Sequence, residues 1–123
     1  MELEELTERV IGCAITVHRT LGPGFLESLY EKAMTIELQN NGLKAEPQKL
    51  VPVFYSQECI GEHRLDLLVE SQLIVELKAI KTLEDVHFAQ VRSYLKACHL
   101  KHGLLLNFST MPLTIKRVIH ESE

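Results

Sequence analysis

The sequence predicts an α/β fold in which helices flank one mixed β-sheet, with elements in the order αα-βββ-α-ββ. Residues 2–40 repeat apolar side chains at three- and four-residue steps, which is the period of amphipathic helices. Residues 50–80 change to strand-like patterns, and a third helical segment then precedes two more apolar runs. A chain of 123 residues without repeats or an internal linker is expected to form one domain over residues 1–123.

The first helix is expected over residues 2–20, and the segment Gly22-Pro23-Gly24 ends it, because proline cannot continue a helical hydrogen-bond ladder. Its core stripe consists of Leu3, Leu6, Val10, Ala14, Val17 and Leu21. The second helix is expected from about Phe25 to Asn40. Its predicted core-facing residues are Leu26, Leu29, Ala33 and Ile36.

Three strands are expected next, over residues 50–55, 61–69 and 73–80. Residues 84–99 return to helical spacing, with a core stripe of Phe88, Val91, Leu95 and Cys98. The continuously apolar run 103–108 predicts a buried strand, and residues 113–119 predict a last strand.

Composition narrows the function classes. The net charge is −4, so the chain is not expected to coat nucleic acid by bulk electrostatics. Residues 1–63 hold ten acidic and five basic side chains, whereas residues 64–117 hold five acidic and eight basic ones, so the second half could present a basic surface. The acidic start of the chain and the lack of a long apolar run predict a cytoplasmic protein without a membrane span.

The cysteines and scattered histidines do not predict a metal centre. Cys13, Cys59 and Cys98 are widely spaced without a CxxC motif, which is typical of reduced thiols. Cys98, His99 and His102 lack a fourth partner for zinc.

The strongest chemical signal lies in the hairpin formed by RLDLLV and LIVELKA. If residues 70–72 form its turn, Asp66 lies directly opposite Glu76, and Lys78 points to the same face. The other face is wholly apolar and contains Leu65, Leu67, Val69, Leu73, Val75, Leu77 and Ala79. Like charges on opposed strand residues are destabilising, but a divalent cation such as Mg²⁺ would reverse the sign of that interaction. Two acids and a lysine on one face therefore suit metal-assisted hydrolysis of phosphodiesters.

An exposed face with alternating ion pairs is the competing explanation. Arg64 with Glu76 and Asp66 with Lys78 are diagonal neighbours that could form such pairs. A turn of even length would also place the two acids on opposite faces.

Several short motifs together resemble the GxxExxY family within the PD-(D/E)xK nuclease superfamily, over nearly the whole chain. They are residues 24–30 (GFLESLY), 64–66 (RLD), 75–79 (VELKA), 87–90 (HFAQ) with 94–95 (YL), 103–108 (GLLLNF) and 115–117 (IKR). The resemblance implies a restriction-endonuclease-like core in which Asp66 and Glu76 bind Mg²⁺ or Mn²⁺, helped by the Leu77 carbonyl, while Lys78 serves the attacking water. Leu65 stands where the nominal motif has proline, a mild departure because proline has no chemical role.

Two further candidates each have two explanations. Glu27 is the motif glutamate of the resembled family and could complete the metal shell, or it could simply favour the positive end of the second helix. Gln90 shares a helical face with His87 and Tyr94, which alone would predict a polar stripe. The resemblance favours Gln90 as a site residue that hydrogen-bonds substrate phosphate or water, with His87 and then Gln48 as weaker candidates. Tyr30 is expected to pack, with its hydroxyl near the site.

The sequence therefore leads to a metal-dependent nuclease acting on DNA rather than RNA. The resemblance implies products with a 3′-hydroxyl and a 5′-phosphate. The alternative is an inactive nuclease-fold module that binds nucleic acid or a partner protein without cleaving. A homodimer, formed through the first helix, would supply additional substrate surface.

Overall fold

Two helices begin the chain in the computed structural model, which describes residues 1–121. They are α1 (Leu3–Leu21) and α2 (Glu27–Asn40). Strands β1 (Ala45–Tyr55), β2 (Glu58–Val69) and β3 (Leu73–Lys78) follow, then helix α3 (Asp85–Cys98) and strands β4 (His102–Asn107) and β5 (Thr114–Ile119). The predicted element order is confirmed.

The five strands form one sheet in the order β1-β2-β3-β4-β5. Three neighbouring pairs are antiparallel, while β3 and β4 are parallel and are joined through α3. The sheet is therefore mixed, as predicted. The parallel pair places the C-terminal ends of β3 and β4 side by side, with Lys78 paired to Asn107.

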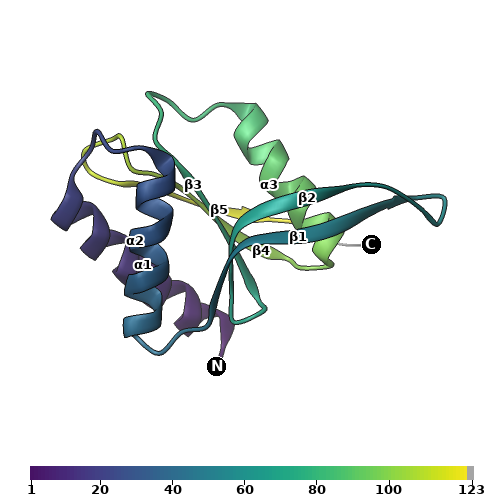
Figure 1. Cartoon of the computed structure of the whole chain (residues 1–123), viewed down its shortest axis with the longest axis horizontal. Coiled ribbons are helices and arrows are strands. Elements are labelled where there is room, and N and C mark those ends of the chain that lie inside the picture. The colour runs from purple at the N-terminus through teal and green to yellow at the C-terminus, as the bar shows by residue number, and fades with distance from the viewer. Residues whose placement is uncertain (122–123) are drawn as a thin grey trace.

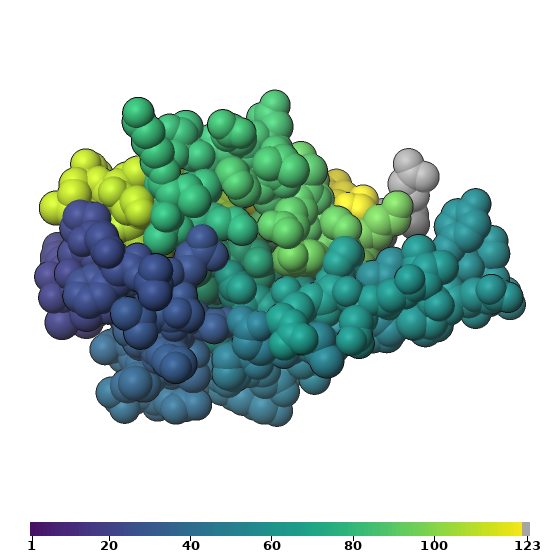
Figure 2. Space-filling view, turned by 45° about the horizontal axis from the view of Figure 1, so that its top comes forward, coloured from purple at the N-terminus to yellow at the C-terminus, as the bar shows by residue number. Residues whose placement is uncertain are grey.

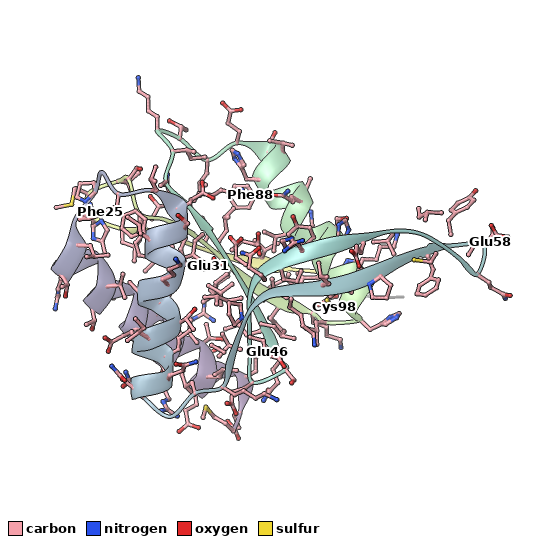
Figure 3. All side chains as sticks on the ribbon, viewed as in Figure 1. Phe25, Glu31, Glu46, Glu58, Phe88 and Cys98 are labelled. Atoms are coloured by element: carbon pink, nitrogen blue, oxygen red, sulfur yellow. The ribbon has the colours of Figure 1, made fainter. Side chains whose placement is uncertain are left out.

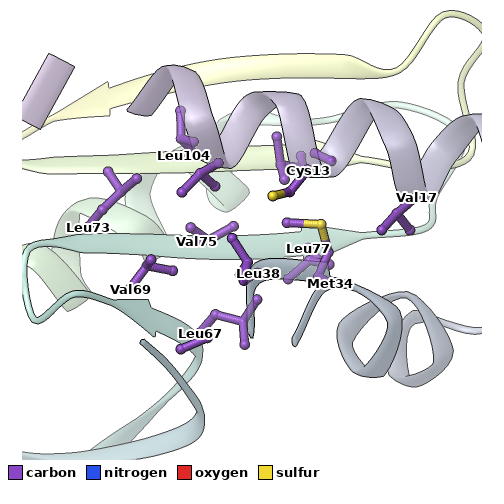
Figure 4. Packing of buried hydrophobic residues seen from close by; sticks show 14 of the residues in the cluster. Cys13, Val17, Met34, Leu38, Leu67, Val69, Leu73, Val75, Leu77 and Leu104 are labelled. Atoms are coloured by element: carbon purple, nitrogen blue, oxygen red, sulfur yellow. The ribbon is translucent and has the colours of Figure 1, made fainter. Parts of the chain in front are cut away.

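Helices cover both faces of the sheet (Figure 1). On one face, α1 and α2 pack against a core that includes Leu67, Val75 and Leu104, and Figure 4 shows Cys13 and Met34 from the two helices over these strands. On the other face, α3 places Val91 and Leu95 against a second core. No helix in residues 1–121 has the length and apolar character needed to cross a membrane.

The predicted core stripe of α2 is wrong except at Ala33, which packs against the core. Leu26, Leu29 and Ile36 are exposed by 72%, 43% and 58%, whereas the buried residues are Tyr30, Met34 and Leu38. Apolar spacing alone allowed either stripe, and a tertiary contact selects the second. The Tyr30 ring stacks on Phe108 with 4.6 Å between ring centroids.

The Tyr30 hydroxyl holds the turn between α1 and α2. It donates to the Gly22 carbonyl at 2.5 Å and accepts from the Phe25 N–H at 3.2 Å. Tyr30 therefore packs as predicted, while its hydroxyl serves the turn that leads into α2.

The predicted position of one residue on the apolar hairpin face is also wrong. Leu65 belongs to the core under α3 together with Leu68, not to the core under α1 and α2. Strand alternation fails here because Asp66 is paired with neither β1 nor β3. Its neighbours Leu65 and Leu67 are paired with Lys49 and Pro47 of β1.

Strands β1 and β2 extend further than predicted. β1 begins at Ala45, before the predicted start at residue 50. The sequence pattern missed this first half because it lacks apolar alternation and contains Pro47, a residue that an edge strand tolerates. Their far halves leave the body of the molecule as a two-stranded arm, visible in Figures 1 and 2. Figure 3 shows Glu58 at the tip of this arm.

Candidate active site

The predicted acids lie where β2 and β3 separate. The ladder between these strands pairs Val69 with Leu73 and continues to Leu67 with Val75, which is the register that the three-residue turn predicted. The next pair in that register would be Asp66 with Glu76, and there the backbone pairing stops. The two acids therefore occupy a fork in the sheet.

At this fork, carboxylates replace backbone carbonyls as hydrogen-bond acceptors. The Asp66 N–H donates to Glu76 Oε2 at 2.8 Å, and the Leu77 N–H donates to Asp66 Oδ2 at 2.9 Å. Each acid thus satisfies an amide of the opposite strand. These two bonds hold both carboxylates across the fork with fixed orientation.

The environment makes ionisation of both acids unfavourable. Glu76 is only 3% exposed, and burial followed by the charge of Asp66 raises the pKa of Glu76 to about 8. Burial also raises the pKa of Asp66, although the Leu77 N–H opposes that rise. Paired carboxyls with raised pKa values are typical of functional sites, where a bound cation offsets the free-energy cost of ionising both groups.

Lys78 and Gln90 lie beside the two acids. Lys78 Nζ donates to Gln90 Oε1 at 3.5 Å, which connects the end of β3 to α3. The positive charge of Lys78 lowers the pKa values of Asp66 and Glu76, against the larger effect of burial, so it acts on both carboxyls. The ion pairs of the described chain do not include Lys78.

A cleft of about 230 Å³ opens from Asp66 toward α2. It is lined by Glu27, Ser28, Glu31, Gln48 and Asp66. Glu27 Oε2 accepts a hydrogen bond from the Ala79 N–H at 3.4 Å, so the predicted Glu27 reaches the end of β3. Its carboxylate therefore faces the site from α2, one residue beyond Lys78.

Glu31 is a site residue that the sequence patterns did not reveal. It lies one helical turn after Glu27, on the side of α2 that faces the hairpin (Figure 3). Its charge raises the pKa of both Asp66 and Glu76, after the larger effect of burial. The side-chain amide of Gln48 donates to Glu31 Oε1, and Gln48 has a left-handed backbone with φ of 52°. The four-residue spacing of Glu27 and Glu31 on one helix was the available signal.

Asn107 is a second missed residue, and it positions the chain that follows Lys78. It is 1% exposed, its Nδ2 donates to the Ile80 carbonyl at 2.8 Å, and its Oδ1 accepts from the N–H groups of Ile80 and Ser109 at 3.2 Å. The Phe108 N–H also donates to the Lys78 carbonyl at 2.9 Å. Asn107 therefore fixes the segment that carries Lys78 and receives Glu27.

The other two polar residues on the predicted face of α3 have structural surroundings. His87 Nδ1 accepts from the Glu84 N–H at 2.8 Å, which caps the start of the helix. Tyr94 is buried, and burial followed by the charges of Glu76 and Asp66 raises the pKa of Tyr94 to about 12. Tyr94 packs in the core beneath α3 together with Leu65 and Ile74, whereas His87 is occupied at the helix end.

The residues at the fork fit one hard divalent cation better than a cage of protein ligands. In residues 1–121, no three His, Cys, Asp or Glu side chains are grouped so that they could hold a metal ion together. Glu27 is therefore not gathered with Asp66 and Glu76, and its role as a ligand stays a prediction, as does that of the Leu77 carbonyl.

The free oxygens of the two acids complete this test. In the described chain, no hydrogen bond engages the second oxygen of Asp66 or of Glu76, and every fully buried polar side-chain atom has a partner. Both second oxygens are therefore accessible. Mg²⁺ characteristically takes one or two carboxylates and keeps several waters, so the pair suits it.

Comparisons with known proteins identify the fold and the family. The chain is similar to the crystal structure of SSO0001, with a TM-score of 0.61 and 14% sequence identity, which is a likeness of fold. The match covers 78% of this chain and 50% of that one, so the chain spans about half the length of that structure. No curated protein matches the chain. The family model of the PD-(D/E)XK nuclease superfamily matches residues 4–118, and the chain therefore belongs to the PD-(D/E)XK nuclease superfamily.

Proposed function

We propose that this protein is a metal-dependent nuclease that hydrolyses phosphodiester bonds of DNA. The observation that carries the proposal is the fork at Asp66 and Glu76, where each acid is held by an amide of the opposite strand. Membership of the superfamily supports the reaction class, since its nucleases generally use divalent metal ions.

Asp66 and Glu76 would hold Mg²⁺ or Mn²⁺ through their free oxygens. When bound, the cation supplies Lewis-acid stabilisation of charge on the scissile phosphate and favours deprotonation of the nucleophilic water. Glu27 and the Leu77 carbonyl are further proposed contributors to the metal shell.

Lys78 has the role of orienting the attacking water. Its ammonium can donate hydrogen bonds to that water and to a phosphate oxygen, because it carries three donors and has no ion-pair partner in the described chain. Gln90 positions Lys78 through the contact at 3.5 Å and can donate its side-chain amide to a phosphate oxygen. The water would attack phosphorus in line with the leaving oxygen and give a 3′-hydroxyl and a 5′-phosphate.

The finer family assignment belongs to the same proposal. Gly24, Glu27 and Tyr30 match the GxxExxY pattern. The Tyr30 hydroxyl hydrogen-bonds the Gly22 carbonyl and the Phe25 N–H, and the Glu27 carboxylate accepts from the Ala79 N–H. The motif residues therefore hold the start of α2 against the end of β3. DNA in preference to RNA, a homodimer and a cytoplasmic location are also proposals.

The test is metal-dependent cleavage of single-stranded and duplex DNA, with RNA as a comparison substrate. Wild type should cleave DNA with Mg²⁺ or Mn²⁺ and not with EDTA, while Glu76→Gln and Lys78→Met should each lose at least a hundredfold in rate. Glu8→Gln, which removes an exposed carboxylate on α1 away from the site and the arm, is the matched control and should keep wild-type activity. Equal rates in all four proteins would show that the activity comes from a contaminant.

Metal binding separates catalysis from the competing function of an inactive module. Isothermal titration with Mn²⁺ should detect binding that Glu76→Gln abolishes. If Mn²⁺ neither binds nor raises the melting temperature at millimolar concentration, a module that binds without cleaving is the better assignment.

A further inference from the structure

The arm formed by β1 and β2 exposes large apolar side chains that the described chain leaves unpacked. Phe54, Tyr55 and Ile60 are exposed by 61%, 72% and 66%. They lie on both strands near the tip, next to a register shift between Val53 and Phe54 that bends the arm. Figure 2 shows the arm projecting from the body, so these residues add nothing to the two cores.

The arm and α3 form the sides of a groove of about 400 Å³. Its lining residues are Pro52, Val53, Phe54, His63, Ser93, Lys96, Ala97 and His99. None of these is acidic, although the whole chain has a net charge of −4. Lys96 contributes a positive charge, and Arg92, one turn earlier on α3, is exposed. The groove thus combines an exposed aromatic ring with cationic and hydroxyl donors.

One groove residue, His63, contacts two residues of α3. His63 Nε2 lies 3.0 Å from Ser93 Oγ, and its ring centroid is 4.7 Å from that of Tyr94. Tyr94 packs in one core with Leu65, the residue that precedes Asp66 on β2. Gly61 pairs with the groove residue Val53 and is five residues from Asp66 along β2, which corresponds to about 16 Å of strand. A polymer that enters the site can therefore reach the groove within a few of its units.

We propose that this groove, between the β1–β2 arm and α3, binds a single-stranded segment of DNA next to the scissile phosphate, with a base stacked on Phe54 and a phosphate on Lys96. Single-stranded nucleic acids are bound in this way, by positively charged grooves with aromatic platforms, and stacking requires an unpaired base. The inference rests on the proposed nuclease function and adds the substrate class to it.

Binding is measured apart from catalysis, by fluorescence anisotropy of a labelled 12-nucleotide thymidine oligomer in EDTA. Wild type should bind this oligomer more tightly than a duplex of the same length. Phe54→Ala should weaken binding about tenfold. Lys96→Gln should also weaken binding and should reduce the slope of log affinity against log salt by about 0.7, the value for one phosphate on a single strand.

Two controls carry the same chemistry away from the groove. Met111→Ala removes a side chain that is 72% exposed in the segment between β4 and β5, and Arg19→Gln removes an exposed charge at the end of α1. Both should bind like wild type. Because Phe54 and Lys96 are exposed, their variants should fold, and circular dichroism checks this.

The outcomes test the single-strand groove and the nuclease function separately. Wild-type affinity in Phe54→Ala and Lys96→Gln, or equal affinity for duplex and single strand, would overturn the groove inference even if wild type cleaves DNA. Loss of binding in both variants, together with no metal-dependent cleavage by wild type, would support the groove and refute the nuclease. If sedimentation shows that Phe54→Ala turns a dimer into a monomer without changing DNA affinity, the arm is an interface between copies and the inference is wrong.

Discussion

The N–H of Asp66 donates to the carboxylate of Glu76, so one acid of the candidate site is held by the backbone of the other. Burial first and the charge of Asp66 second raise the pKa of Glu76 to about 8, and they outweigh the hydrogen bond itself, which lowers that pKa. The burial of Glu76 beside Asp66 therefore makes folding stability depend on pH.

Stability in EDTA should fall as pH rises from 5 to 8. The pKa of Glu76 is 4.5 in the unfolded chain, where the side chain is exposed, and about 8 in the folded protein. Its protonated form therefore stabilises the fold fully below pH 4.5, and this contribution is lost as pH rises through 8. Each unit of pKa displacement corresponds to about 1.4 kcal/mol, or roughly 4 °C in melting temperature for a domain of this size. Differential scanning fluorimetry should show a flatter profile for Glu76→Gln, and an equally steep profile in that variant would contradict the assignment.

Glu31→Gln should weaken Mn²⁺ binding several-fold while raising the melting temperature in EDTA at pH 8. Removing the Glu31 charge relieves repulsion in the acid group, and it also removes attraction for a cation. Titration calorimetry with Mn²⁺ and thermal melting measure the two effects. Glu37→Gln, two turns away from the site along α2, should change neither by a comparable amount.

Asn107→Ala should lose about 2–4 kcal/mol of unfolding free energy and should also lower the rate of DNA cleavage. It leaves both backbone groups of Ile80 and the N–H of Ser109 without their present partner. Urea denaturation gives the stability. The exposed Asn40→Ala is the control, and unchanged cleavage by a folded Asn107→Ala protein would show that the segment after Lys78 needs no such support.

Tyr30→Phe should lower the free energy of unfolding by about 1 kcal/mol, because it removes two hydrogen bonds at the turn and keeps the ring that stacks on Phe108. Tyr30→Ala should lower the free energy of unfolding by about 3–5 kcal/mol, because it also removes the stacked ring. Denaturant unfolding separates the two values. Similar losses in both variants would assign the role of Tyr30 to its hydroxyl alone.

The fold and the acid pair could be predicted because local patterns determine them. Hairpin register follows from a three-residue turn, and alternation then places Asp66 opposite Glu76. The buried stripe of α2 could not be predicted, since Tyr30 is selected by Phe108, a residue 78 positions later. Leu65 was misplaced because alternation assumes continuous pairing, which stops at Asp66.

Glu31 and Asn107 were missed for a related reason. Their partners are Gln48 on β1 and Ile80 in the segment after β3, and no short motif connects them. Predictions for Glu27 and Gln90 depended on resemblance rather than pattern, and their catalytic roles remain predictions.

The fork between β2 and β3 has a consequence for how inactive variants of this protein should be interpreted. Its two acids complete the hydrogen bonding of the central strands, so they act as structural parts of the sheet before any cation or substrate arrives. Replacing them with alanine would leave amides without acceptors in the middle of the protein and would confuse a folding defect with a chemical one. Asparagine and glutamine, which keep an accepting oxygen, remove the negative charge and leave the strands joined.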